Sequence, residues 1–137
     1  DSYNSDLTRV LGTGTIPRRV CELVEIILEA QEKAFEVICP GVSCAEVDRA
    51  ARDVIDESGY GPQFAHSLGH GVGLEVHEAP RLAKGNDEEL KPGMVLTIEP
   101  GIYIPGEAGV RVEDLVVITS DGFEKLSSLP IREYLAV

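Results

Sequence analysis

Histidine residues gather in one short stretch of the chain, where their side chains have clear chemical potential. His66, His70 and His77 are the three histidines of the 137-residue sequence, and all fall within twelve residues. An imidazole titrates near neutral pH and is the commonest side-chain metal ligand. The alternative is three unrelated histidines, two at the surface and one hydrogen-bonded in the core. We interpret the cluster as a set of imidazoles that face a cleft.

The spacing of the first two histidines would suit a zinc-binding helix, but the glycines among them favour a strand. Three glycines alternate with other residues here, at Gly69, Gly71 and Gly73. Each costs a helix about 1 kcal/mol relative to alanine, whereas in a strand glycine permits close approach of another backbone. The apolar residues of segment 72–76 also alternate, with the period of a strand. We therefore predict a glycine-rich strand and its loop.

Two later stretches and the opening of the chain give this segment its context. Residues 97–103 read Thr-Ile-Glu-Pro-Gly-Ile-Tyr, residues 109–114 read Gly-Val-Arg-Val-Glu-Asp, and residues 4–9 read Asn-Ser-Asp-Leu-Thr-Arg. With them, the sequence resembles the pita-bread metallopeptidases of the Xaa-Pro dipeptidase (prolidase) and Xaa-Pro aminopeptidase branch, as far as about Leu126. The resemblance implies an α+β fold. It would be the later part of a creatinase/aminopeptidase fold, a curved antiparallel sheet with two helices on one face.

The resemblance also implies a metal-binding set of four residues, Asp6, His70, Glu99 and Glu113. Taken alone, Asp6 would be interpreted as a turn residue. One imidazole and three carboxylates suit Mn, Co, Fe or Zn in a two-metal site. The family implies two divalent ions, manganese foremost, with a water between them. Asp6 would bridge the ions or bind one of them, His70 and Glu99 would bind the other, and Glu113 would bridge.

Four further roles come from the same likeness. His66 and His77 match substrate-side histidines that hydrogen-bond the substrate and stabilise the tetrahedral intermediate. Tyr103 would line the substrate site. Arg111 precedes Glu113 by two residues, so on a strand the two side chains share a face. We expect a salt bridge from this arginine to hold the glutamate in place. The predicted catalytic residues are thus His66, His77 and Arg111.

The implied reaction is metal-dependent hydrolysis of the peptide bond before proline. In the family pattern another ligand aspartate stands eleven residues before Asp6, ahead of the first residue of this sequence. We therefore expect residues 1–137 to form an incomplete catalytic domain that lacks its N-terminal part. By itself it would hold one ion weakly or none and would be inactive. Whether the parent is a dipeptidase or an aminopeptidase stays open.

Two alternatives share the fold. A non-catalytic peptide-binding module typically loses the ligand residues, which are retained here. A methionine aminopeptidase-like exopeptidase shares the Gly-His-Gly core but normally lacks the first histidine and the form Gly-Val-Arg-Val-Glu-Asp.

Composition limits the partners. The net charge is −12, from 24 acidic and 12 basic residues, which argues against nucleic acid or an anionic membrane as a partner. Three cysteines without a C-x-x-C spacing predict neither a disulfide framework nor a thiolate zinc site, and they fit a cytoplasmic protein. A proline-containing peptide is the expected partner, and the resemblance adds a homodimer.

The elements that must position these residues begin with two helices. Apolar residues recur at three- and four-residue steps over segment 17–38 and predict one long amphipathic helix. Ser43 and Glu46 form a capping box at the start of a second helix, which should end at Gly59.

The rest of the chain predicts loops and strands. Segment 81–91 is polar and predicts a loop, and four β-rich runs follow. These runs are 94–98, 101–104, 110–119 and 123–126. Segment 131–137 would be a short tail.

Overall fold

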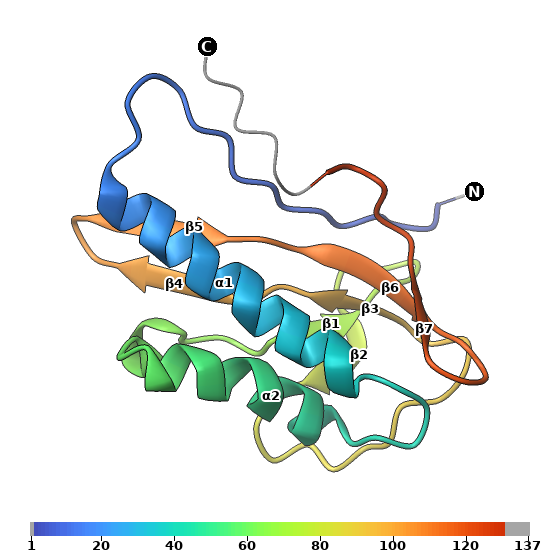
Figure 1. Ribbon diagram of the computed structural model, residues 1–137. Coiled ribbons are helices and arrows are strands. Elements are labelled where there is room, and N and C mark those ends of the chain that lie inside the picture. The colour runs from blue at the N-terminus through green and yellow to red at the C-terminus, as the bar shows by residue number, and fades with distance from the viewer. Residues whose placement is uncertain (1, 131–137) are drawn as a thin grey trace.

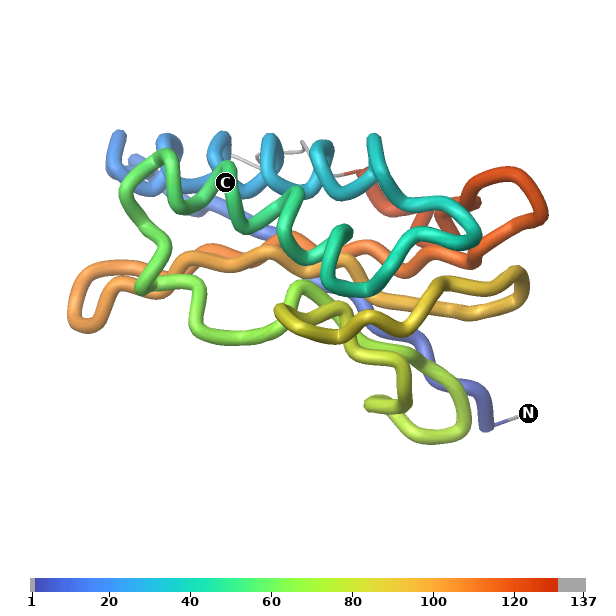
Figure 2. Tube along the Cα trace, turned by 90° about the horizontal axis from the view of Figure 1, so that it is seen from below, coloured from blue at the N-terminus to red at the C-terminus, as the bar shows by residue number. Residues whose placement is uncertain are grey.

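Two helices lie side by side on one face of an antiparallel sheet in the computed structural model, which describes residues 2–130 (Figure 1). Figure 2 shows the helices as one layer and the strands as another. The helices are α1 (Arg18–Val37) and α2 (Cys44–Glu57), followed by the short 3-10 helix η1 (Gly61–Gln63). The α+β class, the antiparallel sheet and the position of the helices are as predicted. The expected tail 131–137 lies outside the described residues.

Seven strands form two sheets. Their bounds are β1 (Gly69–Gly71), β2 (Glu78–Leu82), β3 (Val95–Ile98), β4 (Gly101–Ile104), β5 (Ala108–Arg111), β6 (Asp114–Ile118) and β7 (Phe123–Lys125). The larger sheet has the order β2-β1-β3-β6-β7, and β4 pairs with β5 as a separate hairpin. Each of these pairings is antiparallel.

The core lies between the helices and the sheet. Helix α1 begins directly after Pro17, which suits a proline because the first turn of a helix has free N–H groups. Leu23, Ile27 and Ala34 of its apolar stripe are fully buried. Burial of one large aliphatic side chain contributes about 1.5–3 kcal/mol, so this stripe fixes α1 to the sheet.

Helix α2 has the predicted capping box. The hydroxyl oxygen of Ser43 accepts from the backbone N–H of Glu46 at 3.3 Å, and the Glu46 carboxylate accepts from the Ser43 N–H at 3.2 Å. The helix ends at Glu57, two residues before the predicted end, and Gly59 follows with a φ of +84°. Glycine tolerates that left-handed conformation, which explains its place there.

The predicted strand around the histidines is much shorter than expected. Only residues 69–71 pair as β1, and segment 72–77 is a loop in which Leu74 is 74% and Val76 42% exposed. Their alternation therefore does not mark a buried face. Segment 81–91 is not all loop either, because β2 extends through Leu82.

The glycines of β1 have the predicted use. A methyl group at Gly69 would overlap the carbonyl oxygen of Thr97 on β3, and one at Gly71 would overlap that of Ala79 on β2. These two positions let β1 lie between close neighbours.

The predicted run 110–119 is two strands rather than one. It breaks at Val112 and Glu113, where the chain passes from the β4–β5 hairpin into the larger sheet. Glu113 forms an isolated bridge there with Thr8 of the N-terminal segment.

The N-terminal segment runs beside the sheet, from the side away from the helices up to the layer of the helices (Figure 2). The backbone N–H of Asn4 donates to Gly73 O at 2.8 Å, and the Tyr3 hydroxyl donates to Val72 O at 2.8 Å. These contacts, and the bridge between Thr8 and Glu113, place residues 3–8 against the loop 72–77 and against Glu113. No helix within residues 2–130 is long and apolar enough to cross a membrane.

Candidate metal centre

Four predicted ligands come together from four parts of the chain. Asp6 lies on the N-terminal segment, His70 on β1, Glu99 after β3 and Glu113 before β6. One ligand atom each of Asp6, His70 and Glu113 lies within 4.8 Å of the others. The Nε2 atom of His70 lies 3.1 Å from Glu99 Oε1 and 3.8 Å from Asp6 Oδ2. The set combines one imidazole with three carboxylates.

The backbone around His70 orients its ring toward the carboxylates. Nδ1 lies 3.0 Å from the carbonyl oxygen of Gly71. A carbonyl oxygen only accepts, so Nδ1 carries the hydrogen, and in a neutral ring Nε2 has the lone pair that could bind a metal ion. The backbone N–H of His70 donates to the Thr97 hydroxyl at 3.0 Å, which in turn donates to Glu99 at 3.2 Å. Thr97 therefore holds the imidazole and the carboxylate together.

The electrostatics of the set fit a divalent cation. A lone pair on Nε2 and a carboxylate oxygen 3.1 Å away repel each other unless a proton or a metal ion lies between them. Glu113 is only 2% exposed. Its burial, together with the charges of Glu99 and Asp6, raises its pKa, although a hydrogen bond from Thr8 opposes the rise. A bound cation would offset this charge, and oxygen-rich sets suit Mn²⁺ and similar hard ions.

Three of the four further residues predicted for the site, His66, Tyr103 and Arg111, join it through a chain of hydrogen bonds. The Tyr103 hydroxyl lies 3.1 Å from His66 Nε2 and 3.4 Å from a guanidinium nitrogen of Arg111. Arg111 Nε donates to the Thr8 hydroxyl at 3.2 Å, and that hydroxyl donates to Glu113 at 2.5 Å. The expected salt bridge between Arg111 and Glu113 is not among the ion pairs of residues 2–130. The threonine hydroxyl lies between them instead.

His77 lies beside His70 in an open cleft. The centroids of the two rings are 4.3 Å apart. The cleft has a volume of about 640 Å³, and it is lined by His70, Glu75, His77, Glu78, Ala79 and Arg81. Arg81 brings a guanidinium to this cleft and was not predicted as a site residue, because in sequence it opens a polar stretch. Its position on β2, paired with His70 on β1, is what brings it there.

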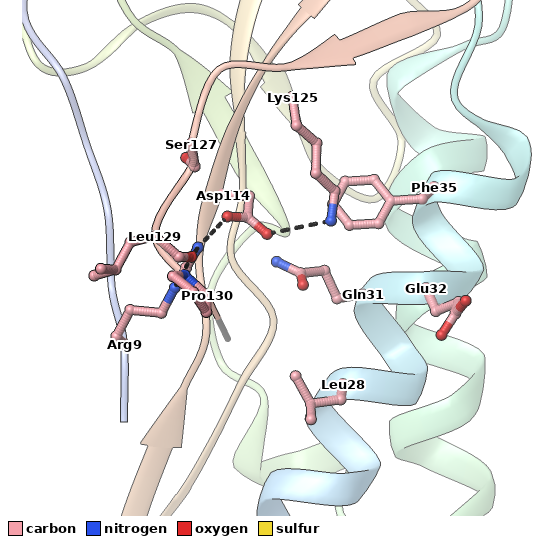
Figure 3. A pocket seen from close by; sticks show the side chains of 10 residues that line it. All are labelled: Arg9, Leu28, Gln31, Glu32, Phe35, Asp114, Lys125, Ser127, Leu129 and Pro130. Carbon is pink, nitrogen blue, oxygen red and sulfur yellow. Dashed lines mark hydrogen bonds and ion pairs between the residues drawn. The ribbon is translucent and has the colours of Figure 1, made fainter. Parts of the chain in front are cut away.

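Arg9 holds the backbone and the neighbour of Glu113 by hydrogen bonds. It donates to the carbonyl oxygen of Glu113 at 2.5 Å, to Asp114 Oδ1 at 2.5 Å and to the carbonyl oxygen of Leu129 at 2.7 Å. The side chain of Glu113 faces the other predicted ligands, and that of Asp114 faces α1. Successive residues of an extended chain point to opposite sides in this way. Figure 3 shows Asp114 between Arg9 and Lys125, whose Nζ lies 3.5 Å from Asp114 Oδ2.

A second cavity lies between α1 and Asp114. It has a volume of about 550 Å³, and α1 contributes Leu28, Gln31 and Phe35 to its wall (Figure 3). It is separate from the cleft of His77, and it does not include any of the four predicted ligands.

Comparison with known proteins identifies the class to which this fold and site belong. Residues 1–120 match metallopeptidase family M24. The Xaa-Pro dipeptidase of Pyrococcus furiosus is 53% identical over 125 residues, which are 91% of this chain and 36% of that protein. The structure is similar to an X-Pro aminopeptidase from Thermotoga maritima, with a TM-score of 0.93, 45% identity and coverage of 97% of this chain and 38% of that one. An Xaa-Pro dipeptidase from Bacillus anthracis gives a TM-score of 0.94 at 46% identity, over 99% of this chain and 38% of the other.

The protein has the pita-bread fold of these peptidases. The chain belongs to metallopeptidase family M24. It spans a little over a third of the length of the relatives it matches.

Proposed function

We propose that the protein carrying this chain hydrolyses the peptide bond before proline in Xaa-Pro peptides. The observation that carries the proposal is the convergence of Asp6, His70 and Glu113 within 4.8 Å, with Glu99 3.1 Å from the imidazole. These four residues would hold two divalent ions, and the oxygen-rich set favours manganese. Such ions lower the pKa of a water and polarise the scissile carbonyl.

The remaining residues of the site would bind and orient the peptide. His77 projects into the cleft beside His70, where an imidazole N–H can donate to charge that develops on the substrate. His66 would act in the same way from the Tyr103 side of the site. Arg111 and Thr8 would keep Tyr103 and Glu113 in place through their shared hydrogen bonds.

Arg81 supports a dipeptide as the substrate. A guanidinium binds a carboxylate through two parallel hydrogen bonds, and Arg81 lines the same cleft as His70 and His77. In an Xaa-Pro dipeptide the free carboxylate lies one residue from the scissile bond. We therefore infer a dipeptidase, in which Arg81 contacts the proline carboxylate.

We infer further that the 137-residue chain alone binds one Mn²⁺ weakly and does not hydrolyse peptides. The support is its coverage of a little over a third of each relative. A cleft wall and ligands supplied by the rest of such a protein would complete the site.

The test measures Mn²⁺ binding by calorimetry and Xaa-Pro hydrolysis in the same sample, for the chain and for two matched variants. His70→Ala should abolish Mn²⁺ binding, whereas His77→Ala, which changes the neighbouring ring, should retain it.

Several outcomes would change the proposal. Equal Mn²⁺ affinity in the chain and in His70→Ala would refute the metal centre. Peptide binding that survives in His70→Ala would favour a binding module. Turnover by the unmodified chain would support the peptidase and contradict the inferred need for further residues. Preferential cleavage of amino-terminal methionine would instead favour a methionine aminopeptidase-like enzyme.

A further inference from the structure

Helix α2 contains an ion pair between a buried aspartate and a partly buried arginine, and the pair faces the segment leading to β1. Asp48 is 1% exposed, and its two carboxylate oxygens accept from Arg52 Nε at 2.9 Å and Arg52 NH2 at 2.8 Å. The pair is bidentate, one helical turn apart, which fixes the plane of the guanidinium. In sequence an i,i+4 pair of this kind is typical of a solvated helix face.

The remaining hydrogen-bonding capacity of the pair is used on the backbone around His66. Arg52 NH1 donates to the carbonyl oxygen of Phe64 and NH2 to that of His66, both at 2.9 Å. Asp48 Oδ1 accepts from the backbone N–H of Leu68 at 3.1 Å. The ion pair therefore holds three alternate residues, and His66 is the middle one.

The contact continues through side chains to the site. The Arg52 guanidinium carbon lies 4.2 Å from the centroid of the Phe64 ring. The edge of Phe64 meets His66, with centroids 5.0 Å apart and planes at 88°. The centroid of the His66 ring also lies 5.5 Å from that of Tyr103, whose hydroxyl it contacts.

We propose that Asp48 and Arg52 are positioning residues for His66. They fix the backbone on both sides of it and, through Phe64, the orientation of its ring toward Tyr103. The catalytic meaning of this placement rests on the proposed function, because His66 is there a substrate-side residue. The placement itself requires neither metal nor substrate.

His70 provides an internal contrast. Its backbone and ring are held by Thr97 and Gly71, on β3 and β1. Neither of these hydrogen bonds involves a residue of α2. Loss of the ion pair should displace His66 and leave the other two histidines in place.

The test is proton NMR of the histidine rings in the metal-free 14.8-kDa chain. With three histidines, each ring can be assigned from a single His→Gln variant. In Arg52→Ala we expect loss of the cross-peaks between His66 and the Tyr103 ring, with retention of those between His70 and His77. Arg49→Ala is the matched control, because Arg49 lies on the same helix with its side chain 66% exposed. The Arg49→Ala variant should retain both the His66–Tyr103 and the His70–His77 cross-peaks.

Three results would overturn the proposal. One is a His66–Tyr103 cross-peak of wild-type intensity in folded Arg52→Ala. Another is loss of both histidine contacts together, which would show that the pair only supports the fold. If Arg52→Ala does not fold, as judged by circular dichroism, Arg52→Lys replaces it. Lysine keeps the positive charge but lacks the planar guanidinium that bonds both oxygens of Asp48. Wild-type intensity in that variant is the third contradicting result. Equal Mn²⁺ affinity in the unmodified chain and in His70→Ala would count against the proposed function and would leave this comparison unaffected.

Discussion

Thr8 lies between Glu113 and Arg111, and its hydroxyl group serves both. It donates its single hydrogen to the Glu113 carboxylate and accepts from the guanidinium through a lone pair. The hydrogen bond opposes the rise in the Glu113 pKa that burial causes. Thr8, which is not a predicted ligand, thus favours the charged form of a buried carboxylate that is one.

Replacement of Thr8 by valine should weaken metal binding by the chain. The change removes both hydrogen bonds at nearly constant volume, and loss of a group that orients a ligand typically lowers metal affinity 10–100-fold, so we expect about tenfold or more. Calorimetry with Mn²⁺ measures the effect. Thr13→Val, in an exposed loop, should bind as tightly as the unmodified chain. Equal affinity in both variants would show that the Thr8 hydroxyl does not support the site.

The site residues were predicted from resemblance more than from local physics. Asp6 by itself would be interpreted as a turn residue. Only the resemblance of segment 4–9 to the family motif predicted it as a ligand. Arg81 and the Asp48–Arg52 pair gave no signal, because their role depends on strand pairing and on the docking of α2. Such contacts join residues far apart in sequence, and no spacing rule contains them.

At the scale of the element, helices were easier to predict than strands. The stripe of α1 and the capping box of α2 are set by neighbours three and four residues away, so the sequence contains them directly. The break between β5 and β6 has no glycine or proline to mark it. It occurs where Glu113 meets Thr8, a contact across 105 residues. The loop that holds Leu74 and Val76 was wrongly predicted as strand for a similar reason, because residues 3 and 4 hold its backbone.

The capping box of α2 gives a prediction at this scale. Ser43→Ala should lower the free energy of unfolding by about 1 kcal/mol and loosen the first turn. Cys44 in that turn reports the change, because it is buried and its pKa is raised, chiefly by burial, to about 11. Alkylation at pH 8, followed by mass spectrometry, should modify Cys44 faster in the variant. Cys39 is exposed and should react at the same rate in both proteins. Ser58→Ala, at the other end of the helix, should leave Cys44 protected.

At the scale of the whole molecule, metal binding should be coupled to stability and to pH. The raised pKa of Glu113 means that, without metal, its protonation stabilises the fold. This contribution is present below the ordinary glutamate pKa and is lost as the pH rises through the raised value. Metal binding requires the carboxylate, so the pH dependence of metal stabilisation has the opposite sign.

We therefore expect Mn²⁺ to raise the thermal midpoint more at pH 7 than at pH 5. At 100 times its dissociation constant the ion should add about 2.7 kcal/mol at neutral pH. Differential scanning calorimetry measures the shift, and a chelator should reverse it. An equal shift at both pH values, or the same shift in His70→Ala, would contradict the coupling.

The N-terminal segment has a consequence for the order in which the molecule forms. Its bonds to Val72, Gly73 and Glu113 span 69 to 105 residues, whereas α1 and α2 are adjacent along the chain. Closing a long loop costs entropy before any contact repays it, so local contacts form first. The helices can therefore assemble before residues 3–8 arrive. Because Asp6 arrives with them, we expect the folding chain to gain affinity for a cation only at the end of folding.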